Sequence, residues 1–158
     1  MRSIRFALVL ASLAALLAAA PASARVEKLV DDSLTGIGVG QAGMFPNIPG
    51  GGRSWVIDEG MGKLWSNGHV LVVVEGLVLG SDAGALAGTN PIPTGRALIS
   101  CDGGDSVAAM SEVVPFSRPD GDAVVNDWVD LPASCPDPIV FFAGITGNGP
   151  AWFARTGA

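Results

Sequence analysis

The chain has 158 residues, of which 15% are charged and 49% are hydrophobic, and its formal net charge is −6 at pH 7. This length suits one domain with a hydrophobic core of its own. The acidic balance disfavours binding to nucleic acid or anionic lipid, because both require basic patches on the protein.

The first 24 residues have the pattern of a secretory signal peptide. Arg2 and Arg5 give a charged start, residues 6–20 form an apolar run, and residues 22–24 (Ala-Ser-Ala) make a small-x-small cleavage site. The run is short for a membrane span, which needs about 20 apolar residues, and no second long run follows. We therefore expect cleavage before Arg25 and a secreted product, extracellular or periplasmic, that has no membrane span.

The elements expected next are a glycine-rich segment and a β-hairpin. Residues 25–51 are poorly patterned, and we expect a loose N-terminal arm that lies over a domain of residues 52–158. Strands are expected at 53–59 and 63–65, and Asn67-Gly68 favours a type I′ hairpin turn. Residues 69–75 (HVLVVVE) then return as a strand that is apolar on both faces until its last residue, which is typical of a strand inside a sheet.

The second half of the chain continues the β pattern. A loop is expected at 80–94, a second hairpin turn at 119–121, a third turn at 147–149, and either a helical turn or a weak strand at 105–111. Strands are expected at 97–101, 112–116, 123–131, 139–142 and 151–154. About eight short strands with regular turns predict an all-β fold, an antiparallel β-sandwich of Greek-key or immunoglobulin-like type.

Two cysteines, Cys101 and Cys135, are expected to form one disulfide in an exported chain. The bond would close a loop of about 35 residues and add about 4 kcal/mol of stability by the chain-entropy relation. A redox role would need a CxxC pair, and a zinc site would need more ligands than two cysteines and one histidine supply.

Cleavage after residue 24 would leave seven basic and fifteen acidic residues, a net charge of about −8.

The motifs of known catalytic machinery are incomplete. Residues 38–43 (GVGQAG) have the dinucleotide-binding spacing, but prolines follow at once where a helix would be needed. His69, the only histidine, begins a strand, and the chain has no G-x-S-x-G elbow. The carboxylates at positions 58, 59, 75 and 112 could act in pairs, as in glycosidases, but their spacing places no two of them across a cleft. We therefore expect no catalytic residues.

Two ligand hypotheses rest on local composition. Trp128 lies close in sequence to Asn126 and Asp130, and an exposed aromatic ring beside amide and acidic groups is typical of a glycan site. Asp102 and Asp105 lie in an acidic, glycine-rich turn whose oxygens could bind calcium. No other cofactor is expected, and most of the tryptophans are expected to lie in the core.

Three segments carry a resemblance to known proteins. They run from Asn90 to Cys101, from Leu131 to Phe141, and from Ala151 to Ala154. Together they resemble small exported bacterial proteins with a one-disulfide β domain, over about residues 52–157. The resemblance implies this fold and no activity, so no functional residues are transferred from it.

The sequence thus predicts a secreted, non-enzymatic β-sandwich that serves as a structural or surface-interaction module for an unknown protein or surface partner. The alternative is a small-ligand module for glycan or calcium, and an enzyme of unfamiliar type is the third hypothesis.

Overall fold

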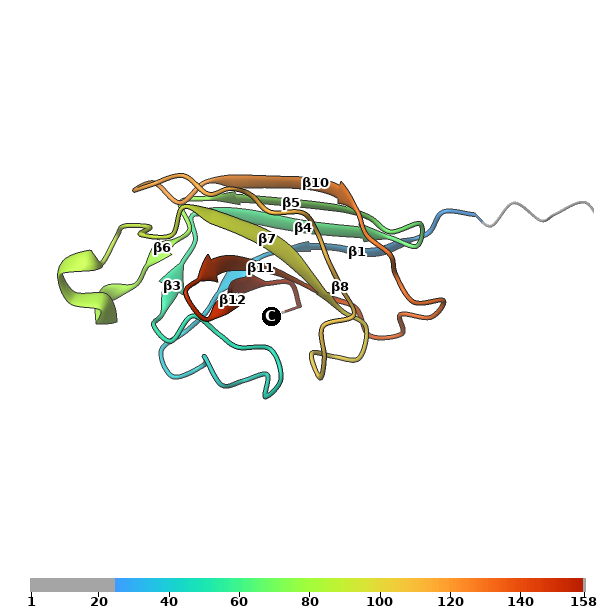
Figure 1. Cartoon of the computed structure of the whole chain (residues 1–158), viewed down its shortest axis with the longest axis horizontal. Coiled ribbons are helices and arrows are strands. Elements are labelled where there is room, and N and C mark those ends of the chain that lie inside the picture. The colour runs from blue at the N-terminus through green and yellow to red at the C-terminus, as the bar shows by residue number, and fades with distance from the viewer. Residues whose placement is uncertain (1–24, 158) are drawn as a thin grey trace, which may run out of the picture.

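The structure is a computed structural model that describes residues 25–157, so the expected signal peptide lies outside the described residues. As predicted, the fold is almost entirely antiparallel β, and its two larger sheets form two layers (Figure 1). Within residues 25–157, no helix combines the length and the apolar character that crossing a membrane requires.

The first layer, sheet A, has four strands in the order β1-β4-β5-β10. These strands are β1 (Lys28–Ser33), β4 (Glu59–Trp65), β5 (His69–Glu75) and β10 (Ala123–Trp128). The strand predicted at 69–75 is confirmed as β5 and lies inside the sheet. Val70, Val72 and Val74 are buried, but the residues between them are partly exposed, so only one face of β5 is buried.

The second layer, sheet B, has the strand order β2-β12-β11-β7-β8, and β9 also pairs with β7. Its strands are β2 (Thr35–Gly36), β7 (Thr94–Ser100), β8 (Ala109–Met110), β9 (Val114–Pro115), β11 (Ile139–Thr146) and β12 (Gly149–Arg155). A two-stranded sheet of β3 (Trp55–Val56) and β6 (Val78–Leu79) lies beside the short 3-10 helix η1 (Ser81–Leu86). The segment at 105–111, for which two conformations were expected, contains the short strand β8.

The core lies between the two sheets and is built from different residue types on each side. Sheet A contributes mainly buried valines, whereas β11 and β12 of sheet B contribute large aromatic residues such as Phe142 and Phe153. The rings of Trp55 and Phe153 stack with their centroids 3.8 Å apart. A Cβ atom at Gly62 of β4 would lie only 2.6 Å from Cγ2 of Thr156, so this glycine allows sheet A to pack closely on the end of sheet B.

The prediction of a loose N-terminal arm at residues 25–51 is wrong, because much of this segment belongs to the sandwich. β1 pairs with β4 in sheet A, and β2 pairs with β12 in sheet B. Ile37 and Ile48 are fully buried. β1 has only two apolar residues, followed by two aspartates, and β2 has only two residues, so neither strand has a clear sequence pattern. The boundary predicted at residue 52 is therefore wrong.

The β4–β5 turn lies where it was predicted but has a different geometry. A type I′ turn requires positive φ at both central residues. Gly68 has φ of 84°, whereas no described residue other than glycine has positive φ, so Asn67 does not meet this requirement. The Gly68 amide donates to the Trp65 carbonyl at 2.9 Å. This is the longer loop in which a single glycine occupies the left-handed position.

The turn at 119–121 joins the two sheets instead of forming a hairpin. β9 before it pairs with β7, and β10 after it pairs with β5. Gly121 has φ of 82°, and a Cβ atom there would lie 2.2 Å from the Leu77 carbonyl oxygen. Glycine is therefore required at the point where the chain crosses from sheet B to sheet A. The turn predicted at 147–149 is confirmed and connects β11 to β12.

The predicted disulfide between Cys101 and Cys135 is present. Cys101 directly follows β7, and Cys135 lies in the loop before β11, the neighbour of β7 in sheet B. Ser100 pairs with Ile139 at the same end of these strands. The bond therefore fastens two strands of one sheet, unlike the disulfide of antibody domains, which joins the two sheets.

Candidate functional site: an aromatic row on an exposed sheet face

Three aromatic rings stack across the outer face of sheet A. Trp65 ends β4, His69 begins β5, and Trp128 ends β10. The His69 ring lies between the two indoles, with centroids 4.6 Å from Trp65 and 4.5 Å from Trp128. The interplanar angles are 20° and 23°, so each indole stacks on the imidazole. We call these residues the aromatic row.

The backbone around the β4–β5 turn holds the aromatic row in register. Trp128 is the direct cross-strand partner of His69. One residue further on, the Val129 amide donates to the Gly68 carbonyl at 2.9 Å. The Asn67 side chain accepts a hydrogen bond of 3.1 Å from the His69 amide. These hydrogen bonds fix the register of β10 against β5, and this register places the Trp128 ring on the His69 ring.

Asn126 fixes the edge of the imidazole. Its Oδ1 atom lies 2.8 Å from Nε2 of His69, a hydrogen bond in which Nε2 is the donor. Asn126 is two residues before Trp128 on β10, and therefore on the same face of the strand. The histidine is thus held from both ring faces and from one ring nitrogen.

The aromatic row differs from the other aromatic residues in its exposure. Trp128 is 65% exposed, whereas Trp55 and Trp152 are 4% and 1% exposed and belong to the core. β10 is an edge strand of sheet A, so the side of Trp128 away from His69 faces solvent beyond the sheet edge. An exposed indole on a rigid strand is a common anchor for a binding partner.

The glycan residues predicted from sequence are partly brought together. Trp128 belongs to the aromatic row, and Asn126 is hydrogen-bonded to His69 of that row. Asp130 is exposed just beyond the end of β10. No local sequence pattern connects them with Trp65 or His69. Trp65 and His69 flank the turn at equal distances from Asn67, and this symmetry was the signal that could have placed them in a cross-strand pair.

The residues predicted to bind calcium are engaged in a turn. The Asp102 carboxylate accepts hydrogen bonds from the hydroxyls of Ser100 at 2.7 Å and Ser106 at 2.6 Å, and from the Ser106 amide at 3.0 Å. These donors, above all the Ser106 side chain, lower the pKa of the Asp102 carboxyl to about 2. The Asp105 carbonyl accepts from the Asn47 side chain at 2.9 Å. In residues 25–157 no group of three or more His, Cys, Asp or Glu side chains is arranged to hold a metal ion.

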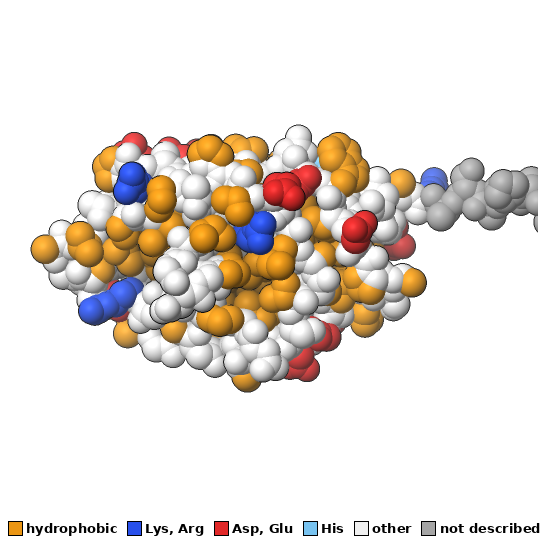
Figure 2. All heavy atoms as spheres, viewed as in Figure 1, with side chains coloured by type: hydrophobic (Ala, Val, Ile, Leu, Met, Phe, Trp, Pro, Cys, Tyr) orange, Lys and Arg blue, Asp and Glu red, His pale blue; other side chains and the backbone are white. Residues whose placement is uncertain are grey.

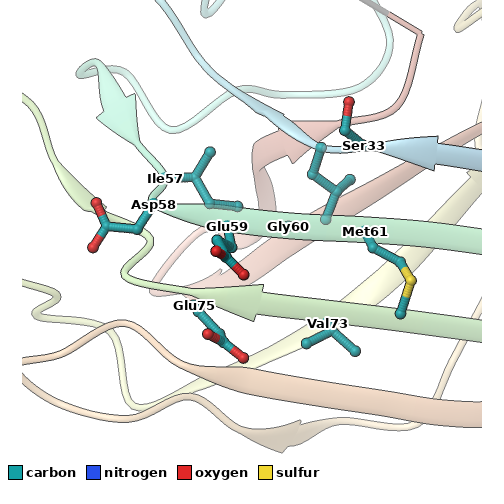
Figure 3. A pocket seen from close by; sticks show the side chains of 9 residues that line it. Ser33, Ile57, Asp58, Glu59, Gly60, Met61, Val73 and Glu75 are labelled. Atoms are coloured by element: carbon teal, nitrogen blue, oxygen red, sulfur yellow. The ribbon is translucent and has the colours of Figure 1, made fainter.

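Carboxylates gather at the other end of sheet A, where the sequence spacing had placed no pair. Glu59 of β4 is the direct cross-strand partner of Glu75 of β5. Figure 3 shows them side by side, with Met61 and Val73 further along the same two strands. Asp122, just before β10, accepts a hydrogen bond of 2.9 Å from the Gly76 amide. We call Glu59, Glu75 and Asp122 the acidic row.

Three open hollows meet at Glu75. Two of them, of about 580 Å³ each, contain Asp58, Glu59 and Glu75 in their linings. The third, of about 410 Å³, extends across β5 to Asp122 and Val124. Among the described residues, no lysine or arginine lines any of the three. Along the upper edge of Figure 2, where β10 lies in Figure 1, hydrophobic and acidic side chains reach the surface, and a basic side chain lies near the acidic ones at the left end.

The fold and the site together define an all-β protein with two main sheets, a disulfide within one sheet and an exposed aromatic row on the other. Comparison with known proteins finds no family model, no curated protein and no solved structure that matches the chain. The resemblance to small exported bacterial proteins therefore stays a prediction.

Proposed function

We propose that this chain is a secreted, non-enzymatic β-sandwich protein that acts as a surface-interaction module and binds its partner through the outer face of sheet A. The observation that carries the proposal is the 65% exposure of Trp128 within an ordered stack. A side chain of this size that contributes little to the core, yet is fixed by a neighbouring ring, is already ordered before a partner arrives. Such order reduces the entropy that binding would otherwise lose.

Chemical features of the chain support the secreted and non-enzymatic parts of the proposal. The disulfide is a bond that persists in oxidising compartments, which agrees with export by the signal peptide expected at residues 1–24. His69, the only histidine of the chain, has both ring faces against indoles and its Nε2 atom on Asn126. This arrangement holds the imidazole in place and does not direct it at a hydroxyl or thiol nucleophile.

Glycan binding at Trp128 is the second candidate function. The solvent-facing side of the indole could stack on a pyranose ring, while the Asn126 amide and the Asp130 carboxylate supply polar groups nearby. Calcium has weaker support, because Asp102 already accepts three hydrogen bonds within its own turn.

A thermal-melt panel tests the proposed function. The exported protein would be melted with soluble oligosaccharides, synthetic peptides and calcium. A ligand at 100 times its Kd should add about 2.7 kcal/mol of stability, a rise in Tm of about 5 °C. We expect Trp128→Ala to abolish the rise. Val39→Ala, at a position 74% exposed in the loop after β2, should leave it unchanged.

Two results would contradict the proposal. One is a ligand-induced rise that survives Trp128→Ala. The other is turnover of a hydrolase substrate by the wild-type protein that is lost in Glu75→Gln, since this would make the chain an enzyme that uses the acidic row.

A further inference from the structure

The outer face of sheet A is graded in chemical character along its strands. Side chains that point away from the core form four rows across β4, β5 and β10. The two middle rows pair directly across all three strands, whereas in the outer rows only His69–Trp128 and Glu59–Glu75 are direct partners. In order along the strands, the rows are Trp65–His69–Trp128, Lys63–Leu71–Asn126, Met61–Val73–Val124 and Glu59–Glu75–Asp122. The face therefore runs from an aromatic row, through a mixed row, to an apolar row and an acidic row. The one cation among these rows, Lys63, is paired with Asp31 of β1 at 3.3 Å.

The members of the four rows on the β10 side (Asp122, Val124, Asn126 and Trp128) are all exposed, so no described segment covers this side of the face. Val124 of the third row is 58% exposed. Met61 and Val73 are half-buried beside it. We call Met61, Val73 and Val124 the apolar row. An apolar row between an aromatic and an acidic row is the composition of a docking surface.

The size of the face limits what it can hold. Three intervals of two residues, at about 3.3 Å per residue, give a length of about 20 Å, and the four strands of sheet A, about 4.8 Å apart, give a width of about 20 Å. The area is on the order of 400 Å², whereas a stable complex of two folded proteins buries about 800 Å² per partner. A second copy of the chain would also bring its own acidic surface to the acidic row. A short segment fits better, since a helix of about 13 residues is about 20 Å long.

Charge decides the character of that segment. The acidic row and the neighbouring Asp58 line hollows that have no basic residue among their described linings. A cationic side chain placed beside these carboxylates would be attracted to them, whereas an acidic side chain would be repelled.

We propose that the outer face of sheet A binds a short, basic, amphipathic segment of a partner polypeptide. Its apolar side lies over the apolar row and against Trp128, and its cationic end lies at Glu59 and Glu75. This inference rests on the proposed function, and it adds the chemical class and the direction of the bound segment.

The test uses a fluorescent 14-residue peptide of leucine and lysine with leucines at helical spacing. Its matched partners are a scrambled peptide and a peptide with glutamate in place of lysine. Binding to the exported protein is measured by anisotropy. We expect the basic amphipathic peptide to bind more tightly than both partners, with an affinity that falls as salt is added.

Variants place the binding on this face. Glu59→Gln/Glu75→Gln should raise the Kd for the peptide about fivefold, and Val73→Asn should also weaken binding. The matched control is Asp105→Asn/Asp137→Asn, which removes the same charge from exposed turns beside the disulfide, outside sheet A. It should leave the Kd within about twofold.

The outcomes separate this inference from the proposed function. Equal binding of the basic and acidic peptides, or an equal loss of binding in the control variant, would overturn the inference. If only an oligosaccharide binds, and Trp128→Ala abolishes that binding, the proposed function stands and the basic segment is wrong. If neither peptide nor oligosaccharide responds to Trp128→Ala, both are overturned.

Discussion

Glu59 and Glu75 lie directly opposite each other on β4 and β5, so two carboxylates of like charge occupy one cross-strand pair. Like charges in this position destabilise a sheet. A pair of this kind is retained at the cost of stability, which is typical of residues kept for binding.

Replacing Glu75 by glutamine should therefore stabilise the protein. The expected gain in the free energy of unfolding is about 0.2–1 kcal/mol, because the repulsion with Glu59 is removed while the strand is kept. Urea denaturation measures it, and the gain should shrink in high salt. A loss of stability would show that the Glu75 carboxylate has a structural partner. A gain also ensures that weaker peptide binding in this variant is not caused by unfolding.

The disulfide should supply a large part of the stability. Cys101 and Cys135 are 34 positions apart, and a loop of that length corresponds to about 4 kcal/mol by chain entropy. We expect Cys101→Ser/Cys135→Ser to lower the free energy of unfolding by about that amount, measured by urea denaturation. Intact mass of the exported protein after alkylation should show both thiols consumed, and alkylation at either cysteine of the unreduced protein would contradict the assignment.

Asp102 should contribute stability that depends on acid pH. Hydrogen bonds from Ser106 and Ser100 lower the pKa of its carboxyl from 3.8 to about 2 in the folded protein. A lowered pKa means that the contribution is fully present above pH of about 4 and is lost as the pH falls through about 2. Asp102→Asn should therefore be less stable than the wild type at pH 7, with the difference closing between these values. Melting curves at a series of pH values measure this, and a difference that does not change with pH would contradict it.

The aromatic row should make a measurable contribution of its own. His69→Ala removes both ring contacts, and each aromatic pair contributes about 0.5–1.5 kcal/mol. We expect a loss of about 1–2 kcal/mol by urea denaturation and a change in the near-ultraviolet circular dichroism of the indoles. His69→Phe, which keeps the stacking and loses only the hydrogen bond to Asn126, should recover most of the loss. No recovery would show that the hydrogen bond, and not the stack, holds the row.

The sequence was a good guide where strands are regular and the turn residues are strong. Asn67-Gly68 and the run at 69–75 predicted the β4–β5 hairpin, and the cysteines predicted the disulfide. The N-terminal strands were missed because β1 gains its stability from pairing with β4, and its own sequence (KLVDDS) carries little strand pattern.

The candidate site was predicted only within single strands. Asn126 and Trp128 could be connected because they are two residues apart on one strand. Their contacts with His69 depend on the pairing of β10 with β5, across a separation of more than fifty residues in which the chain passes through sheet B. Local patterns do not determine such a pairing. The Glu59–Glu75 pair was within reach, because both residues are eight positions from Asn67.

The indole N–H signals of the four tryptophans test the binding face most directly. Trp65 and Trp128 lie on the outer face of sheet A, whereas Trp55 and Trp152 are buried in the core, so the four signals report on separate parts of the molecule. In a nitrogen-15 NMR titration with the leucine–lysine peptide and with the oligosaccharides, we predict that a bound ligand shifts the signals of Trp128 and Trp65 and leaves the buried pair unchanged. A bound ligand that leaves Trp128 and Trp65 unchanged would contradict the assignment of this face as the binding surface.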